Sequence, residues 1–337
     1  MPSLRDIPAP AKINLFLHVT GRRADGYHLL QTAFRFIDLQ DTLHIATRED
    51  GRITRLNDVP GVPEDEDLVV RAARSLQAAT GCTLGAEIEL VKRIPMGGGL
   101  GGGSSDAASV LLALNRLWNC GLTREQLMEL ALPLGADVPV FVFGRNAFAE
   151  GVGEQLRPLD LPPRWYVIVQ PDASVPTPEI FRAPELTRDS APVRIADFSG
   201  SNTCPGENSG RQDSKVSDTP DRFGALKNDL EPVAFARFPE VARIAGVVTE
   251  VLASGMQSNA LDPGRKVRMS GSGACLFVEC DTPEQASWAV EQIAGRMRQR
   301  CCVESAAVEE SMTDLPYVRI NRVCAGLAVH PLLEWVA

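Results

Sequence analysis

A glycine-rich segment holds the clearest chemical signal in the sequence. From Pro95 to Ser109 the chain reads PMGGGLGGGSSDAAS, with six glycines among the seven residues 97–103. Glycine has no Cβ, so this backbone adopts positive φ angles easily and lets a ligand approach its N–H groups. Ser104 and Ser105 are good N-cap residues, and residues 106–118 form a strong helix sequence. A glycine loop that leads into a helix N-terminus binds anions, which indicates a phosphate site.

Three established nucleotide-binding motifs do not account for this loop. The Walker A motif needs a lysine directly after its glycines, and none follows here. Gly97, Gly99 and Gly102 match the dinucleotide-binding spacing, but a second helix follows where that motif needs a strand ending in an acidic residue. The H-R-D and D-F-G triplets of protein kinases are absent from the sequence. A flexible linker is the remaining alternative, and the helix directly after the glycines argues against it.

No other group of residues stands out by its spacing alone. The histidines are too dispersed for a recognisable metal set; they are His18, His28, His44 and His330. The sequence contains no G-x-S-x-G motif of a serine hydrolase. By residue type alone, Lys12 is a surface lysine at a strand end and Asp137 is an aspartate in a turn.

The elements around the loop mix strands and helices without a steady alternation. Before the loop, strands are predicted at 11–19, 32–39, 42–47 and 86–91, with a turn at Gln40-Asp41 between the second and the third. Helices are predicted at 64–79, 124–132, 231–252 and 283–300. Later strands are predicted at 147–151, 164–170, 267–270 and 274–279. This mixture favours an α+β fold over a doubly wound sheet.

Composition and charge exclude several classes of function. The chain has 337 residues and a net charge of −9, so it lacks the basic field that nucleic-acid binding requires. It has no signal-peptide core and no apolar run of membrane-spanning length. Its eight cysteines are scattered without a C-x-x-C pair, as in proteins of a reducing compartment. We therefore expect a cytoplasmic protein with neither a nucleic-acid nor a membrane partner.

Three prolines between Leu156 and Arg164 indicate a domain boundary. We expect an N-terminal domain over residues 1–160 and a C-terminal domain over residues 161–337. Within the second domain, residues 184–227 include a polar stretch rich in glycine and serine. Such a composition predicts a surface insertion or a disordered loop.

Three blocks of the sequence together resemble the GHMP family of small-molecule kinases. They are PAKINLFL at 10–17, the glycine loop, and MSGSGACLF at 269–277. The segments 23–32, 134–141, 147–153 and 175–178 are similar to one branch of that family, whose acceptor is a cytidine-diphosphate-linked methylerythritol. The resemblance covers most of the chain and lapses over about 184–221 and the C-terminal tail.

The resemblance implies an N-terminal mixed α/β domain, a ferredoxin-like C-terminal domain and a cleft between them. It implies ATP as the phosphoryl donor, with Mg²⁺, and transfer to the 2-hydroxyl of the acceptor in non-mevalonate isoprenoid biosynthesis. Two alternatives stay open: a related kinase acting on homoserine or mevalonate-type alcohols, and a catalytically silent nucleotide-binding module. The sequence is compatible with a monomer or a homodimer.

The family pattern also implies roles for individual residues. Asp137 takes the proton of the acceptor hydroxyl, and Lys12 keeps that carboxylate ionised and polarises the attacking oxygen. The residues expected to bind ATP are Lys92, Pro95, Met96, Gly97, Gly98, Gly99, Leu100, Gly101, Gly102, Gly103, Ser104 and Ser105. Those expected to bind the acceptor are Asn14, Tyr27, His28, Thr177 and Phe181.

Within the acceptor site, Tyr27 and Phe181 would stack on the cytosine and His28 would hydrogen-bond its polar edge. The alternative for the two aromatic residues is packing in the core. Asn14 and Thr177 would contact the diphosphate and the sugar side.

Two aspartates near the loop are unexpected in a site that binds phosphate, because both carry negative charge. Asp67 stands where the family often has an asparagine near adenine, and a carboxylate there would accept a hydrogen bond from the adenine amino group. Asp106 begins the phosphate-facing helix, where its charge repels phosphate unless Mg²⁺ intervenes. Ser105 and Asp106 are therefore the candidate metal ligands.

Overall fold

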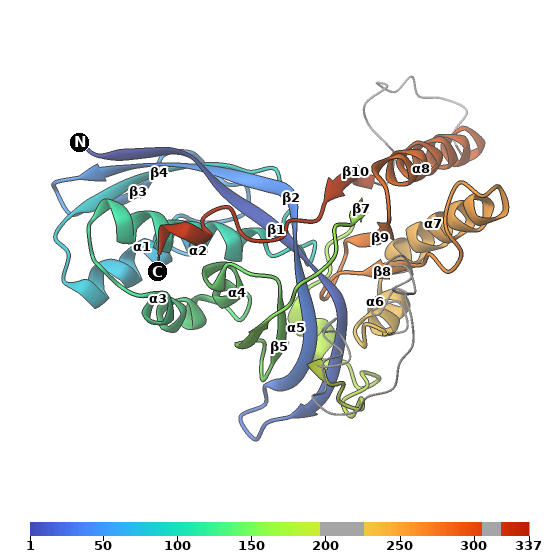
Figure 1. Ribbon diagram of the computed structural model, residues 1–337, viewed down its shortest axis with the longest axis horizontal. Helices are drawn as coiled ribbons and strands as arrows, with labels where there is room; N and C mark the ends of the chain where they lie inside the picture. The colour runs from blue at the N-terminus through green and yellow to red at the C-terminus, as the bar shows by residue number, and fades with distance from the viewer. Residues whose placement is uncertain (196–225, 305–317, 337) are drawn as a thin grey trace, which may run out of the picture.

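The computed structural model describes residues 1–195, 226–304 and 318–336, which form two sheets with their helices (Figure 1). The larger sheet is built on a hairpin of two long antiparallel strands, β1 (Ser3–Arg22) and β2 (His28–Arg48). The other edge of β2 pairs with β4 (Gly85–Val91) at one end and with β5 (Ala147–Glu150) at the other. The outer strands of this sheet are β3 (Ile53–Arg55) and β6 (Gln155–Pro158).

The larger sheet and its helices form the first layer. These helices are α1 (Leu68–Thr80), α2 (Gly102–Leu117), α3 (Arg124–Ala131), the 3₁₀ turn η1 (Leu132–Leu134) and α4 (Val138–Phe143). α1 and α2 pack against the sheet, and the other helices pack mainly against these two and each other. Every residue from Ser105 to Asn115 in α2 is buried, so this helix is surrounded on all sides, as a helix without a polar face must be. α2 therefore gives the glycine loop a rigid base.

The smaller sheet has the strand order β10–β7–β9–β8. Its strands are β7 (Trp165–Pro171), β8 (Val267–Met269), β9 (Leu276–Cys280) and β10 (Val318–Ala325). Its helices are α5 (Thr177–Arg182), α6 (Glu231–Arg237), α7 (Pro239–Gln257) and α8 (Pro283–Glu304). With α7 between β7 and β8, and α8 between β9 and β10, the layer has the β-α-β-β-α-β order of a ferredoxin-like fold. The chain is thus α+β, as predicted.

After β10 the chain returns to the first layer, and we call residues 326–336 the return segment. Its Leu327 N–H donates to Phe36 O, and its His330 N–H donates to Gly144 O at the end of α4. The short η3 turn (Leu333–Trp335) follows, and Arg124 of α3 donates to Leu333 O. Both termini consequently lie at the same end of the molecule (Figure 1). The return segment packs against the N-terminal layer, and the domain division at residue 160 stays a prediction.

Most of the expected elements are present, with two clear differences: the helix predicted at 231–252 is broken at Phe238 into α6 and α7, and one predicted turn is absent. The capping box of Thr123 and Gln126 starts α3 as predicted. The predicted turn at Gln40-Asp41 is wrong, because β2 runs straight through it. Asp41 is fully buried, and its carboxylate accepts hydrogen bonds from the N–H groups of Arg93 and Ile94. A buried carboxylate with backbone partners from another segment fixes an extended strand, although the same residue type is common in turns.

The predicted insertion at residues 184–227 lies mostly outside the described residues. Its first part packs against the hairpin: the N–H of Ser190 donates to Val19 O, and the N–H of Val193 donates to Gln31 Oε1. Leu186 is 4% exposed. Leu186 belongs to the core of the second layer, so this described part connects the hairpin to that layer and carries residues close to the site.

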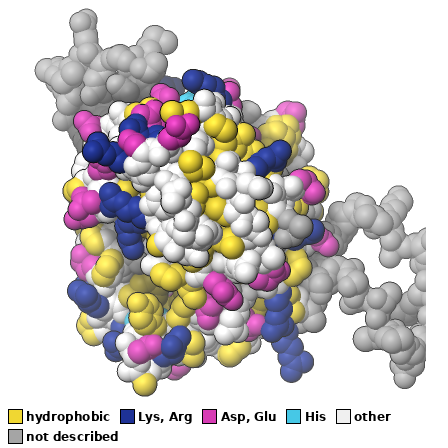
Figure 2. All heavy atoms as spheres, turned by 90° about the vertical axis from the view of Figure 1, so that its left-hand side faces the viewer, with side chains coloured by type: hydrophobic (Ala, Val, Ile, Leu, Met, Phe, Trp, Pro, Cys, Tyr) yellow, Lys and Arg dark blue, Asp and Glu magenta, His cyan; other side chains and the backbone are white. Residues whose placement is uncertain are grey.

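The outer surface carries charges of both signs. On the face seen in Figure 2, Lys and Arg side chains alternate with Asp and Glu, and neither sign gathers into one large patch. Among the described residues, no helix is both long and apolar enough to cross a membrane.

Candidate active site

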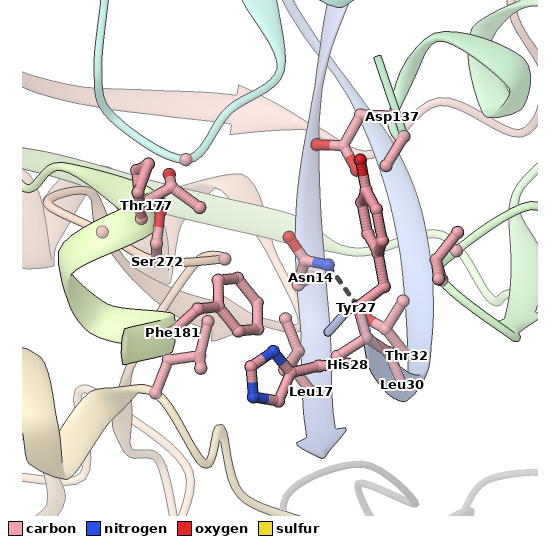
Figure 3. A pocket seen from close by; sticks show the side chains of 18 of the residues that line it. Asn14, Leu17, Tyr27, His28, Leu30, Thr32, Asp137, Thr177, Phe181 and Ser272 are labelled. Carbon is pink, nitrogen blue, oxygen red and sulfur yellow. Dashed lines mark hydrogen bonds between the residues drawn. The ribbon is translucent and has the colours of Figure 1, made fainter. Parts of the chain in front are cut away.

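A cavity of about 820 Å³ lies between the two layers. Its walls come from β1 and the hairpin tip, the glycine loop, the residues before α4, helix α5, and the turn between β8 and β9. Ten of the predicted site residues line it, several of them labelled in Figure 3: Lys12, Asn14, Tyr27, His28, Gly97, Gly99, Ser104, Asp137, Thr177 and Phe181. The fold thus brings together five segments that are far apart in the sequence.

Lys12 and Asp137 meet at one end of this cavity. Lys12 is 2% exposed, which excludes its alternative role as a surface lysine. Its ammonium lies 3.2 Å from Asp137 Oδ2 and donates to Asn14 Oδ1 at 2.6 Å and to Gly99 O at 3.0 Å. Asp137 occupies the N-cap position of α4, but its side chain does not cap the helix. The carboxylate is therefore left to face Lys12 and the cavity.

Asn14 is held on the same face of β1 as Lys12, because alternate residues of a strand share a face. Its amide donates to Thr32 Oγ1 at 2.9 Å, the bond drawn in Figure 3. Its backbone N–H donates to Ser270 Oγ, which donates in turn to Gly99 O at 2.9 Å. This chain of bonds ties β1, the glycine loop and the β8–β9 turn to each other.

The glycine loop packs directly on the β8–β9 turn. The N–H of Cys275 donates to Gly98 O at 3.1 Å, and Gly99 has a φ of +72°. A Cβ at Gly99 would lie 2.1 Å from Ser270 O, and one at Gly98 would lie 2.6 Å from Cys275 Sγ. These glycines are required by the close approach of two backbones, in addition to any contact with a ligand.

Helix α2 starts earlier than the sequence suggested. The expected N-caps, Ser104 and Ser105, lie inside the helix, and Gly101 is the N-cap with a φ of +72°. Only glycine adopts this left-handed conformation at little cost. The helix therefore begins inside the glycine loop, at Gly102, and not after it. The N–H groups of Gly102, Gly103 and Ser104 belong to the first turn, where N–H groups have no partner within the helix. A helix start of this kind, with its positive dipole end, is suited to bind an anion.

The other predicted ATP residues surround the loop without lining the cavity. Met96 is 47% exposed, whereas Leu100 is 1% exposed and packs in the core between the two sheets. Lys92 lies below the start of α2, where its ammonium bridges Asp41 and Asp106. Asp67 is the N-cap of α1 and pairs with Arg55, so its carboxylate is already bound within the protein.

Ser105 and Asp106 do not fit the role of Mg²⁺ ligands. Both are buried, and Ser105 Oγ and Asp106 Oδ1 have no hydrogen-bond partner among the described residues. Burial raises the pKa of Asp106 to about 8, against the lowering effect of Lys92, whose ammonium lies 2.7 Å away. The Asp106 carboxyl faces the interior and is bound by Lys92, and neither Ser105 nor Asp106 lines the cavity, so neither is placed to reach a cation there. The described residues also contain no cluster of three or more metal-ligating His, Cys, Asp or Glu side chains.

Tyr27, His28 and Phe181 line the cavity from the hairpin tip and from α5; in Figure 3, His28 and Phe181 lie away from Asp137, whereas the Tyr27 ring extends toward it. Tyr27 is 66% exposed, which excludes a core role for it, whereas Phe181 packs partly against the second core. The His28 and Phe181 rings lie 5.1 Å apart at 33° to each other (Figure 3). Burial lowers the pKa of His28, and the charges of Arg188 and Arg22 lower it further. His28 is therefore neutral at physiological pH.

Sequence reasoning missed several residues around the site. Arg22 and Arg182 line the cavity, and Ser272, which lies in the MSGSGACLF block but was given no role of its own, shares a 2.7 Å hydrogen bond with Thr177. Arg188 lies outside the cavity and donates to His28 Nε2 at 3.1 Å. Arg22 lies one residue before the segment 23–32 that carried the resemblance, so the sequence could have predicted that it lies near the site. Arg188 belongs to the predicted insertion, where no sequence signal pointed to it.

Comparison with known proteins agrees with this geometry. Residues 67–145 match the family model described as the GHMP kinases N terminal domain. The chain is 55% identical over 336 residues to the 4-diphosphocytidyl-2-C-methyl-D-erythritol kinase of Bordetella bronchiseptica, covering 99% of each. It is 52% identical to the enzyme of the same name from Aromatoleum aromaticum, covering 88% of this chain and 91% of that one.

Solved structures give the same result. A crystal structure of 4-(cytidine 5'-diphospho)-2C-methyl-D-erythritol kinase superimposes with a TM-score of 0.65 at 35% identity, covering 96% of this chain and 98% of that one. A homoserine kinase from Cytophaga hutchinsonii shares the fold alone, with a TM-score of 0.60 at 16% identity, covering 98% and 96%. At these identities and coverages, the chain belongs to the 4-diphosphocytidyl-2-C-methyl-D-erythritol kinase family, a branch of the GHMP kinases.

Proposed function

We propose that this protein transfers the γ-phosphoryl group of ATP to the 2-hydroxyl of 4-diphosphocytidyl-2-C-methyl-D-erythritol. One observation carries the proposal: a single cavity has the Lys12–Asp137 pair and the glycine loop at one end and the His28 and Phe181 rings at the other, with Tyr27 on its wall. An acceptor that contains both an alcohol and a nucleobase fits such a cavity. Homoserine and mevalonate have no base for the aromatic end.

At the phosphate end, the N–H groups of the first turn of α2 and the loop would hold the ATP triphosphate. Mg²⁺ would enter with the nucleotide, bound to its phosphates, because the buried Ser105 and Asp106 are not placed to hold it. The loop would thus bind and position the donor, while the proton chemistry takes place at Asp137.

At the reacting hydroxyl, Asp137 would accept the proton while Lys12 stabilises the negative charge. At the observed 3.2 Å, their attraction is worth about 5 kcal/mol at an effective dielectric constant near 20, before desolvation. Water screens part of this, since the Asp137 side chain is 37% exposed. A carboxylate is a weak base for an alcohol, but phosphoryl transfer has a loose transition state in which positioning matters more than basicity.

At the base end, Tyr27 and Phe181 would stack on the cytosine, and Asn14 and Thr177 would contact the sugar and diphosphate. Arg22 and Arg182, which also line the cavity, add positive charge for the diphosphate. We place this activity in the cytoplasm, where ATP is available.

The test is ATP consumption by the purified protein, measured with the cytidine substrate and Mg²⁺ and, in parallel, with homoserine and with mevalonate. We expect turnover with the cytidine compound alone. Turnover of homoserine or mevalonate instead would assign the protein to another branch of the family, and binding of ATP without any turnover would make it a nucleotide-binding module.

A further inference from the structure

Arg188 holds together the two rings at the base end of the cavity, although it does not line the cavity itself. Its Nε donates to His28 Nε2 at 3.1 Å. Its Nη2 donates to Phe181 O at 3.1 Å and to Ala183 O at 2.7 Å, and its Nη1 donates to Leu186 O at 2.9 Å. The guanidinium therefore closes the C-terminal end of α5 and connects it to the hairpin tip.

These bonds determine the protonation state of His28. A guanidinium is always charged and has no acceptor, so the nitrogen that faces it must offer a lone pair. His28 Nε2 is then unprotonated, and the ring proton of the neutral imidazole is on Nδ1. The structure gives Nδ1 no hydrogen-bond partner among the described residues, so its N–H is available to a ligand in the cavity.

A fixed donor at this position distinguishes the two pyrimidine bases. Cytosine has acceptors at N3 and O2, whereas uracil has a hydrogen on N3. A neutral histidine that is free to exchange its proton could meet either base, with Nδ1 as donor to cytosine or as acceptor from uracil. With Nε2 occupied by Arg188, only the first arrangement is available.

We propose that Arg188 is a positioning residue that locks His28 as an Nδ1–H donor and thereby makes the site select a cytidine over a uridine substrate. This inference rests on the proposed function, since it assigns a base to the aromatic end. The lowered pKa of His28 is consistent with the neutral ring that such a lock requires. An arginine suits the role because its planar fork reaches the imidazole and the carbonyls at the end of α5 at once.

The first experiment reads the histidine directly, without any substrate. Long-range ¹H–¹⁵N spectra distinguish the two neutral tautomers, and the chain has only four histidines, so His28→Gln assigns the signals. We expect the Nδ1–H form in the wild type and the Nε2–H form, which free imidazoles favour, as the major species in Arg188→Met. An Nε2–H tautomer in the wild type would overturn the proposal, even if Arg188→Met does not fold.

The second experiment compares kcat/KM for the cytidine-diphosphate-linked and the uridine-diphosphate-linked methylerythritol. We expect the wild type to prefer the cytidine compound by about 100-fold or more, and Arg188→Met to reduce this ratio about 10-fold, mainly through KM. Arg188→Lys should restore part of the ratio, because an ammonium still donates to Nε2. Arg237→Met is the matched control: Arg237 pairs with Glu179 of α5 and with Glu185, away from the imidazole, and should leave the ratio unchanged.

If the ratio of kcat/KM between the cytidine and the uridine compound stays constant in Arg188→Met while KM rises, Arg188 only stabilises α5. That result would reject its role in selectivity. A wild type that turns over neither pyrimidine compound would instead contradict the proposed function, and the tautomer measurement would still decide the state of His28.

Discussion

The two ends of the cavity differ in whether backbone or side chains form them. The phosphate end consists mainly of backbone: glycines in close contact with another turn, the first N–H groups of a helix that is buried from Ser105 to Asn115, and the buried Lys12. The base end consists of side chains from the hairpin tip and from α5, and one of them, Tyr27, is largely exposed. The phosphate end must therefore fold as one piece with the core, whereas the base end can be changed residue by residue.

The largest effect is expected at Asp137, where the phosphate end depends on one side chain. Asp137→Asn keeps the shape but cannot take up the proton, so kcat should fall about 1,000-fold while KM for ATP changes little. Steady-state kinetics with the cytidine substrate measure both quantities. Near-normal kcat in this variant would remove Asp137 from the proton transfer.

The next effect tests whether the glycines are needed for backbone packing. Gly97 and Gly99 have nearly equal φ angles, +69° and +72°, so alanine is equally strained at both. Only at Gly99 would the new Cβ meet a backbone oxygen, at 2.1 Å; at Gly97 it would lie 3.3 Å from Ser174 Oγ. We expect Gly97→Ala to lower the free energy of unfolding by about 1–2 kcal/mol and Gly99→Ala by about 3 kcal/mol or more.

Chemical denaturation measures this pair of variants, and ATP binding should follow the same order. Equal costs for the two variants would show that only the φ angle matters, and the packing argument would fail.

At the base end, single changes should alter affinity without altering the fold. Phe181→Leu keeps the contact with the second core but removes the aromatic face, so KM for the cytidine substrate should rise about 10- to 100-fold. KM for ATP and the melting temperature should stay close to those of the wild type. A matching loss of ATP affinity would show that the two ends are not separable.

The last effect, on stability and not on catalysis, concerns pH. Burial lowers the pKa of His330, in the return segment, to about 3. The unfolded chain takes up this proton below its usual pKa near 6.5 and the folded protein does not, so stability is full above pH 6.5 and falls as the pH decreases toward 3. The loss from this group is roughly 2–3 kcal/mol between pH 6.5 and 4.5.

His330→Asn keeps an acceptor for the N–H of Leu332, which bonds His330 Nδ1 at 3.1 Å, and should flatten the pH dependence of unfolding in this range. His44→Asn is the control, because its Nδ1 also accepts a backbone N–H, that of Asp6. An unchanged slope in His330→Asn would assign the acid sensitivity to other groups.

The difference between backbone and side-chain parts of the site also explains what the sequence could predict. The glycine loop was recognisable because a backbone requirement leaves few choices of residue type, and α2 and α3 followed from periodicity and capping. The exact start of α2 was missed because it depends on the left-handed Gly101. The continuity of β2 was missed because it depends on the buried partners of Asp41, which come from residues about fifty positions away.

Arg188 shows the limit of such prediction most clearly. An arginine in a polar segment is usually solvated, and only the folded chain places this one against His28 and the end of α5. Side-chain sites assembled from distant segments leave no local pattern, whereas backbone sites do.

The return segment also affects when the first layer can finish folding during translation. Residues 326–336 supply partners for Phe36 in β2 and for Gly144 at the end of α4, but the ribosome makes them after the whole of the second sheet. Domains usually fold in the order in which they are translated. Here the first layer is completed by the return segment, which is translated after the second sheet, and its glycine loop packs on the β8–β9 turn of that sheet. The nascent protein therefore lacks a finished phosphate end until its second layer has been made.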